Sequence, residues 1–350
     1  QRQMCIRDST SVLASIRNFA PANLTWLYTY LFLLGAIAGP KAVFSFCSLV
    51  GSLVQKTIAK KRRNYGHGVG FAIGIVAFAA FLYGFTFGFT KIKVRHETLY
   101  LHNLPKNFDG YRIVHVSDLH VGTFTSWRTS ILEDEMDGIK RINPDLILFT
   151  GDLQNMRPSE LLPVADLLKQ GMKNAIAVRG NHDYTEYVKL TQQQRKQQNR
   201  EFEDIVRNKL GWNLLQNSHI AIHKGNDSII IAGTENDGMP PFPQKADYKK
   251  ALEGVQQGNF VIMLQHDPSA WKRHILPQNL AQLTLSGHTH GGQMQFFGFR
   301  PTHIREKYDY GIYRSGNNIL NVTDGLGGLV PFRLNMPNEI VVITLKAKTT

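Results

Sequence analysis

The stretch that decides the fold is Val114-His115-Val116-Ser117-Asp118-Leu119-His120, in which an apolar run ends in an aspartate and a histidine. Short apolar runs bounded by polar or turn residues indicate buried strands. Strands that alternate with helical patterns, as they do between residues 111 and 178, indicate βαβ units. Further polar motifs follow in the chain, most of them just after an apolar run: Gly151-Asp152, Gly180-Asn181-His182-Asp183, His266, and Gly287-His288-Thr289-His290 with Gly291-Gly292. Because active sites in such folds gather at the carboxyl ends of strands, we expect these motifs to meet.

The chain from residue 91 to residue 350 is predicted to form two packed sheets with helices outside them, an α/β architecture. Residues 187–210 are polar and rich in glutamine; they are expected to form a solvated helix on an insertion, with a lid over the site as the alternative. Helices are expected at 131–141 and 161–169. Strands are expected at 91–101, 111–116, 145–149, 175–178, 218–223, 228–232, 260–264, 282–285, 318–322 and 340–345.

The motif side chains are of the kinds that bind divalent cations. Asp118 and His120 lie two apart, and alternate residues of an extended chain point the same way, so both are expected to face one ion. Asp152 has two carboxylate oxygens that can bridge two ions, and Asn181 offers an amide oxygen. Imidazole nitrogens come from His266, His288 and His290. This mixed oxygen and nitrogen set favours Mn, Fe, Zn or Co over Ca or Mg alone.

Two such cations, about 3.5–4 Å apart, bind the attacking and leaving oxygens of a phosphoryl displacement. Gly151, Gly180 and Gly287 each precede a ligand residue, and we expect turns there whose backbone angles favour glycine. A lone Asp-x-His or Gly-Asp is a weak signal, but all the motifs in one order are specific. The remaining histidines lack this context and are expected to be structural: His67, His96, His102, His115, His219, His223, His274 and His303.

Charge is distributed unevenly along the 350 residues, whose formal net charge is +13. Residues 1–96 contain 12 of the 40 Lys and Arg but one of the 27 Asp and Glu, so the motif region is nearly neutral. A nucleic-acid-binding domain carries a basic face, and none is expected on the motif region. The two cysteines, Cys5 and Cys47, precede the motifs, so the motif region has neither a disulfide nor a thiolate metal site.

The N-terminal part of the chain is predicted to be a membrane region, residues 21–90, with two or three transmembrane helices. Residues 69–90 hold 22 positions without a charge, enough to cross about 30 Å of hydrocarbon. The shorter apolar runs 24–38 and 42–54 flank Gly39-Pro40-Lys41 and are expected to be two short spans or a helical hairpin. Since the chain opens on glutamine, the preceding segment 1–20 is expected to be truncated.

Basic residues between 56 and 63 favour a cytoplasmic loop, which would put the motif region on the extracytoplasmic side of an inner membrane. Lys91, Lys93 and Arg95, just after the last apolar run, argue against that orientation.

The ordered motifs resemble the calcineurin-like metallophosphoesterase family over roughly residues 111–345, and the apolar N-terminal region is similar to its bacterial membrane-anchored branch. The resemblance implies an αββα sandwich that holds two divalent metal ions. It implies that His182 is not a ligand but faces the phosphate and protonates or stabilises the leaving oxygen. The implied first site is Asp118, His120, Asp152 and His290, and the implied second site is Asp152, Asn181, His266 and His288.

One departure from the family pattern concerns Gly151-Asp152-Leu153-Gln154-Asn155, where protein-phosphatase members have a second aspartate and an arginine. This difference argues against a protein phosphatase and leaves open which group partners His182; Asp183 is adjacent but could be structural.

The expected function is hydrolysis of a phosphodiester, phosphomonoester or pyrophosphate at the membrane, with a lipid-linked substrate among the options. Apolar residues near the motifs, which could receive acyl chains or be ordinary core residues, are Phe124, Trp127, Phe296, Phe297, Phe299 and the run Leu329-Val330-Pro331-Phe332. The alternatives are a non-catalytic metal-stabilised binding module, a nucleotide phosphodiesterase with a soluble substrate, and a membrane sensor. Neither the oligomeric state nor the identity of the metals follows from the sequence.

Overall fold

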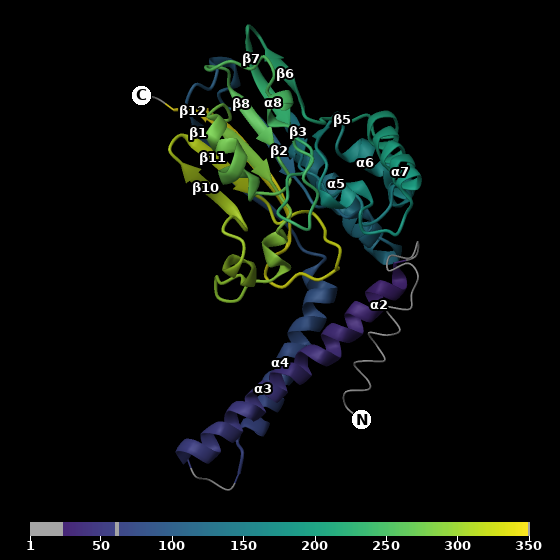
Figure 1. Ribbon diagram of the computed structural model, residues 1–350, viewed down its shortest axis with the longest axis vertical. Helices are drawn as coiled ribbons and strands as arrows, with labels where there is room; N and C mark the ends of the chain where they lie inside the picture. Colours follow the sequence, from purple (N-terminus) through teal and green to yellow (C-terminus); the bar gives the residue numbers. More distant parts are fainter. Residues whose placement is uncertain (1–23, 60–62, 349–350) are drawn as a thin grey trace.

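The computed structural model describes residues 24–59 and 63–348, and it consists of an α/β head carried on a stalk of two long apolar helices (Figure 1). The head begins at Phe89 and contains all the motifs. The predictions for residues 1–20, for Cys5 and for the centre of the basic loop at 60–62 lie outside the described residues.

Sheet A has six strands, and all neighbours are parallel except β12 and β2, which are antiparallel. The prediction missed β5, which is two residues long. In spatial order the strands are β1 (Ile92–Leu101), β12 (Asn338–Ala347), β2 (Arg112–Val116), β3 (Leu146–Phe149), β4 (Ile176–Ala177) and β5 (Asn213–Leu214).

Sheet B also has six strands, parallel in its centre and closed at each edge by an antiparallel pair. The prediction missed β10, whose residues are partly exposed. In spatial order the strands are β10 (Gly311–Ser315), β11 (Asn318–Val322), β9 (Leu283–Ser286), β8 (Val261–Leu264), β7 (Asp227–Gly233) and β6 (Ser218–Lys224).

The two sheets pack face to face because successive residues of a strand point to opposite faces. Ile113 and Leu148 of sheet A lie in the core between the sheets with Ile231 and Ile262 of sheet B. Their neighbours Val114 and Phe149 point outward, into a second core beneath helices.

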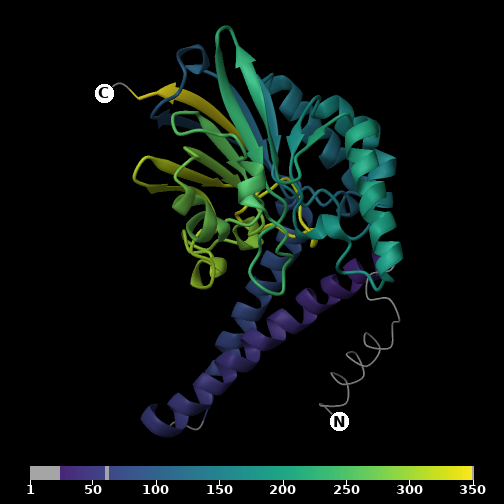
Figure 2. The same ribbon diagram turned by 45° about the horizontal axis from the view of Figure 1, so that its top comes forward.

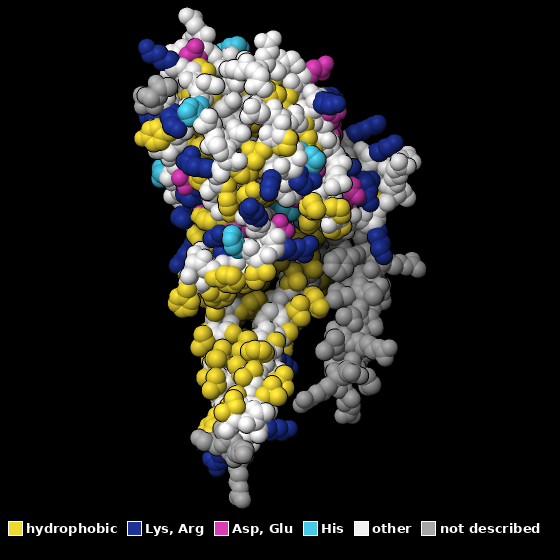
Figure 3. Space-filling model, turned by 60° about the vertical axis from the view of Figure 1, so that its left-hand side comes forward, with side chains coloured by type: hydrophobic (Ala, Val, Ile, Leu, Met, Phe, Trp, Pro, Cys, Tyr) yellow, Lys and Arg dark blue, Asp and Glu magenta, His cyan; other side chains and the backbone are white. Residues whose placement is uncertain are grey.

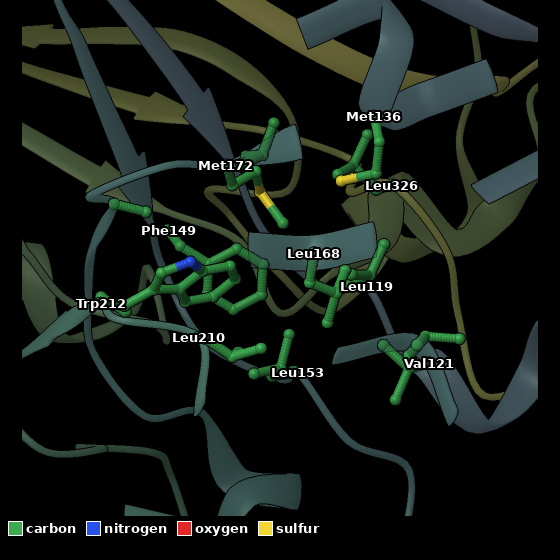
Figure 4. Packing of buried hydrophobic residues seen from close by; sticks show 14 of the residues in the cluster. Leu119, Val121, Met136, Phe149, Leu153, Leu168, Met172, Leu210, Trp212 and Leu326 are labelled. Carbon is green, nitrogen blue, oxygen red and sulfur yellow. The ribbon is translucent and has the colours of Figure 1, made fainter. Parts of the chain in front are cut away.

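Helices cover the outer face of each sheet, which confirms the predicted αββα architecture (Figure 2). Over sheet A, Met136 and Leu168 from two helices meet Phe149 and Trp212 (Figure 4). The helices over sheet A are α5 (Thr129–Ile142), α6 (Ala165–Gly171) and α7 (Gln192–Asp204). Over sheet B lie α8 (Tyr248–Ala251), the π-helical turn η10 (Trp271–Ile275) and α9 (Leu276–Gln278).

The polar segment after residue 187 forms α7, which begins with a capping box between Thr191 and Gln194. Phe202 of α7 is buried in the core over sheet A, as are Ile205 and Val206 of the π turn η9 (Ile205–Lys209) that continues the helix. The helix is therefore part of the outer layer, with a solvated face, and is not a lid.

The stalk corrects the prediction for the first two apolar runs, because they form one continuous helix from Thr25 to Ile58 of 34 residues. It comprises α2 (Thr25–Leu33), the π turn η1 (Leu34–Ala38), α3 (Gly39–Val54) and the π turn η2 (Gln55–Ala59). Proline lacks the N–H that a helix interior needs, and Pro40 lies in the first turn after η1, where that loss is tolerated. The residues Gly39-Pro40-Lys41 thus lie within a helix and do not form a turn between two helices.

The second stalk helix comprises α4 (Gly66–Tyr83) and the π turn η3 (Gly84–Gly88), together 23 residues. Among the described residues, these are the two helices long and apolar enough to cross a membrane. Figure 3 shows apolar side chains covering the stalk and continuing onto the base of the head.

Candidate metal centre

The motif residues lie at the carboxyl ends of the central strands of both sheets, as predicted. In sheet A, Asp118 follows β2, Asp152 follows β3 and Asn181 follows β4. In sheet B, His266 follows β8 and His288 follows β9. Because the sheets pack face to face, these ends form one site that spans both of them.

Backbone hydrogen bonds tie the motif loops to one another. The N–H of Asp118 donates to the Gly151 carbonyl at 2.8 Å, and the N–H of His120 donates to the Asp152 carbonyl at 3.1 Å. Across the sheets, the N–H of His288 donates to the Asp118 carboxylate at 2.9 Å. The loops therefore hold each other at fixed separations.

The side chains form three overlapping groups that could each hold a cation. Asp152 Oδ2 lies 3.2 Å from His266 Nε2 and 3.6 Å from His120 Nε2, so it stands between the groups. Asp118 Oδ1 lies 3.4 Å from His290 Nε2. The groups are Asp118, His120 and His290; His120, Asp152 and His182; and Asp152, His266 and His288.

Several side chains of the site carry buried polar atoms that have no hydrogen-bond partner among the residues that the structure describes. They include both ring nitrogens of His120, Nδ1 of His290 and Oδ1 of Asn181. A buried polar atom without a partner is costly, and metal coordination removes that cost. These donor types match a site for divalent transition metals.

The electrostatics of the site attract positive charge. Burial raises the pKa of Asp152, but the neighbouring imidazoles, His266 first, outweigh it and hold that pKa well below its usual value. Burial opposes protonation of His266 as well, yet Asp152 and Asp118 raise its pKa to about 10. Two buried carboxylates thus favour a cation beside them, whether a proton or a metal ion.

The backbone at the ligand motifs is left-handed, which corrects the expectation of an extended chain. Asp118 has φ 52°, His120 φ 49°, Asp152 φ 58°, His288 φ 73° and His290 φ 51°. Non-glycine residues rarely adopt positive φ, and such strained residues cluster at functional sites. Asp118 and His120 do face one point, but a sharp turn brings them there.

The glycine prediction is correct for Gly151, which has φ 98°, and wrong in its reason for the other two. Gly180 has an ordinary φ of −97°, but a Cβ there would lie 2.2 Å from Asp152 Oδ1. A Cβ on Gly287 would lie 2.1 Å from Asp118 Oδ2. These two positions need glycine because a carboxylate packs against their Cα atoms.

His182 and Asp183 have distinct partners. Nδ1 of His182 lies 2.6 Å from the carbonyl oxygen of Asn155, which can only accept, so Nδ1 carries a proton. The Asp183 carboxylate accepts four backbone N–H groups: those of Asp152, Leu153, Gln154 and Gly180. Asp183 is therefore structural, and a carbonyl group takes the place of a carboxylate partner for His182.

Sequence reasoning missed two neighbours of the site, Tyr187 and Asp267. Tyr187 accepts a hydrogen bond from Asn181 Nδ2 at 2.7 Å and packs against the His182 ring. Asp267 Oδ2 lies 3.6 Å from His288 Nε2. Only adjacency to a motif could have pointed to Asp267, and no pattern marks Tyr187.

His115 is structural, as expected, and is buried between the sheets. Its Nδ1 accepts from Asn321 Nδ2 at 2.7 Å, while Nε2 lies 2.9 Å from Thr150 Oγ1. Asn321 Oδ1 in turn accepts from Arg95. This network fixes the ring as the neutral Nε2–H tautomer.

Comparison with known proteins agrees with this geometry. Residues 111–292 match the model of the calcineurin-like phosphoesterase family. An uncharacterized metallophosphoesterase of Bacillus subtilis is 30% identical over 305 residues, covering 82% of this chain and 98% of the relative. An uncharacterized metallophosphoesterase of Aquifex aeolicus is 29% identical over 267 residues, which cover 73% of this chain and 93% of the relative.

A third relative, from Danio rerio, is named a transmembrane protein with a metallophosphoesterase domain. It is 30% identical over 279 residues, which cover 76% of this chain and 60% of the relative. These matches show that the chain, with its αββα fold, belongs to the calcineurin-like phosphoesterase family.

Proposed function

We propose that this metal-dependent phosphoesterase binds two divalent cations and uses His182 as its general acid. The observation that carries the proposal is the central position of Asp152, whose carboxylate belongs to two of the three potential ligand groups. The proposed first site is Asp118, His120, Asp152 and His290, and the proposed second site is Asp152, Asn181, His266 and His288. Two bound cations would neutralise phosphate oxygens and lower the pKa of a coordinated water.

The chain's own residues supply positioning and a proton. The Asn155 carbonyl accepts from His182 Nδ1, which fixes the ring and leaves Nε2 as the atom that can protonate a leaving oxygen. A hydrogen bond from His266 Nδ1 to the Thr150 carbonyl at 2.7 Å likewise turns the Nε2 of His266 toward Asp152. Both rings are oriented before any substrate arrives.

Replacing Asp152 with Asn tests the proposal. The variant should lose at least about 100-fold in kcat with a chromogenic phosphodiester and Mn, because the shared carboxylate is gone. Replacing His182 with Ala should leave Mn affinity nearly unchanged while slowing turnover. Full activity of the Asp152→Asn variant would refute the two-cation assignment.

We propose further that residues 21–90 anchor the enzyme in a membrane and that residues 91–350 are the catalytic domain. Large apolar side chains on the stalk are exposed, Trp26 by 77% and Phe71 by 66%, which suits lipid surroundings. The stalk helices form a hairpin, in which the end of η2 and the start of α4 lie away from the head (Figure 1). Basic residues lie between these two helices in the sequence. The positive-inside rule then puts the head outside the cytoplasm.

A membrane-impermeant maleimide tests the orientation. Ser315 is exposed on the head, and a Ser315→Cys variant should react in intact cells, while the parent chain provides the background. Labelling only after cell lysis would place the head in the cytoplasm.

A lipid-linked phosphate ester is the proposed substrate class. In the segment after His290, Phe297 is fully exposed, Phe296 is 43% exposed and Phe299 is 52% exposed. It lies at the base of the head, because Gln295 hydrogen-bonds to Leu334 beside the stalk contact of Phe332. Exposed apolar side chains such as phenylalanine can insert at the boundary between lipid headgroups and acyl chains.

Two residues suggested by the sequence are unsuited to bind acyl chains. Phe124 is buried in the core over sheet A, and Phe332 packs on Gly84 and Phe81 of the stalk. Trp127 is 54% exposed and remains a candidate.

The lipid proposal predicts that Phe297→Ser lowers hydrolysis of phosphoesters presented in vesicles several-fold and leaves a water-soluble phosphodiester unaffected. Equal rates for both kinds of substrate in the parent and the variant would count against a lipid-linked substrate.

A further inference from the structure

One stalk residue reaches into the head beside the candidate centre. Tyr28 lies in the first turn of α2, where Trp26 and Thr29 are exposed, yet Tyr28 itself is only 7% exposed. Its ring packs with Met156 and Val188 of the head. The N-terminal turn of α2 therefore makes a specific contact with the head.

The hydroxyl of Tyr28 takes part in a buried hydrogen-bond network. It lies 3.2 Å from the Gly122 carbonyl, to which it donates, and 3.1 Å from Thr123 Oγ1. It accepts from Asn155 Nδ2 at 3.0 Å, and the same amide group donates to Thr123 Oγ1 at 2.8 Å. Both amide hydrogens of Asn155 thus have partners, one of them on the stalk.

Asn155 is the residue whose carbonyl holds His182. Its backbone N–H is fixed too, by the Glu160 carboxylate at 2.6 Å. Two hydrogen bonds, both made by Asn155, therefore connect Tyr28 to the imidazole of His182. The Tyr28 hydroxyl holds the Asn155 side chain, and the Asn155 carbonyl orients the His182 ring.

We infer that Tyr28 is a positioning residue that couples the apolar stalk to catalysis, by holding Asn155 in the place from which it orients His182. This inference rests on the proposed role of His182 as general acid. A displacement of α2 in the membrane would move the Tyr28 hydroxyl, loosen Asn155 and misplace the proton donor. Tyr28 hydrogen-bonds directly to none of the proposed metal ligands, because its hydroxyl partners are Gly122, Thr123 and Asn155. The ligand side chains are therefore expected to keep their affinity for metal.

The test compares leaving groups in the full-length protein, reconstituted with Mn. A general acid matters most for poor leaving groups, so a misplaced His182 steepens the dependence of kcat on leaving-group pKa. Tyr28→Phe keeps the ring and removes the hydroxyl. It should lower kcat about 5-fold for an alkyl phosphodiester and less than about 2-fold for a nitrophenyl ester, with unchanged Mn affinity.

Controls separate positioning from general stability. Tyr30→Phe, on the same helix, should behave like the parent protein. In a double-mutant cycle, Tyr28→Phe should have no further effect once His182 is Ala, because both changes act on one proton transfer. Asn155→Ala, which keeps the backbone carbonyl but loses the amide, should reproduce the altered leaving-group dependence.

The outcomes distinguish the inference from its premise. If His182→Ala does not steepen the leaving-group dependence, the proposed role of His182 is wrong. If His182→Ala does so and neither Tyr28→Phe nor Asn155→Ala does, Tyr28 has no positioning role. Additive effects in the double-mutant cycle would also overturn the inference.

Discussion

At the scale of single residues, the candidate centre depends on backbone conformations that the residue types do not themselves favour. Asp118, His120 and Asp152 all have positive φ, and each bends the chain just after a strand. Gly180 and Gly287 then allow carboxylates to pack directly on the main chain. The ligand side chains converge because the residues with positive φ turn the chain and the glycines leave room for the carboxylates.

Gly287→Ala tests this packing. The new Cβ would lie 2.1 Å from Asp118 Oδ2 and from Ser117 Oγ, so the carboxylate must move. We expect Mn affinity to fall about 10- to 100-fold, as when supporting contacts of a metal site are lost. Gly68→Ala is the matched control, since a Cβ there meets nothing within 4 Å. Calorimetric titration with Mn measures both, and unchanged affinity in Gly287→Ala would contradict the argument.

At the scale of elements, the stalk is a helical hairpin built on small residues. A Cβ on Gly66 would lie 2.3 Å from the Cys47 carbonyl oxygen, and one on Gly70 would lie 2.9 Å from the Cys47 Cβ. The two helices therefore touch along their backbones, as small residues permit in lipid.

Gly66→Leu should separate the stalk helices, whereas Gly68→Leu faces open space and should not. Overpacking of this kind costs about 1–3 kcal/mol. A cysteine pair introduced across the hairpin should crosslink less efficiently in Gly66→Leu than in Gly68→Leu. Equal crosslinking would show that this face does not pack.

At the scale of the whole molecule, polar networks join the two sheets next to the site. Arg95 on β1, Asn321 on β11 and His115 on β2 form one chain of hydrogen bonds. A proton on His115 Nδ1 would replace the hydrogen bond from Asn321 Nδ2 with a repulsive contact between two N–H donors. Burial, with a smaller effect of Arg95, lowers the pKa of His115 to about 3.

This lowered pKa predicts acid sensitivity. Below pH 6.5 the unfolded chain protonates this histidine and the folded chain does not, so stability falls from about pH 6.5 toward pH 3. The slope is about 1.4 kcal/mol per pH unit. The difference in Tm between the parent and His115→Gln should therefore shrink from pH 7.5 to pH 4.5. The exposed His223→Gln is the control, and a constant difference for His115→Gln would contradict the prediction.

Metal removal should weaken the whole head, because the proposed ligands come from both sheets. Chelation should lower Tm by several degrees, since Asp118 and Asp152 would lose the cations that offset their buried charge. In Asp152→Asn the loss should be smaller. The same loss in both proteins would show that Asp152 does not bind the metal.

The sequence by itself determined ten of the twelve described strands, the order of the ligand motifs and the apolar character of the stalk. These follow from local patterns: short apolar runs in β2 and β3, polar residues directly after them, and uncharged runs long enough for a membrane. The family resemblance also implied the site residues that the fold brings together.

Tertiary structure alone decided how those pieces meet. One long helix replaces two short spans, because Pro40 falls in the first turn after a π turn, which a hydropathy pattern does not reveal. The partner of His182 is a backbone carbonyl, and backbone groups carry no sequence signature. The contact of Tyr28 with Asn155 joins residues 127 apart, and such contacts depend on packing rather than on any local pattern.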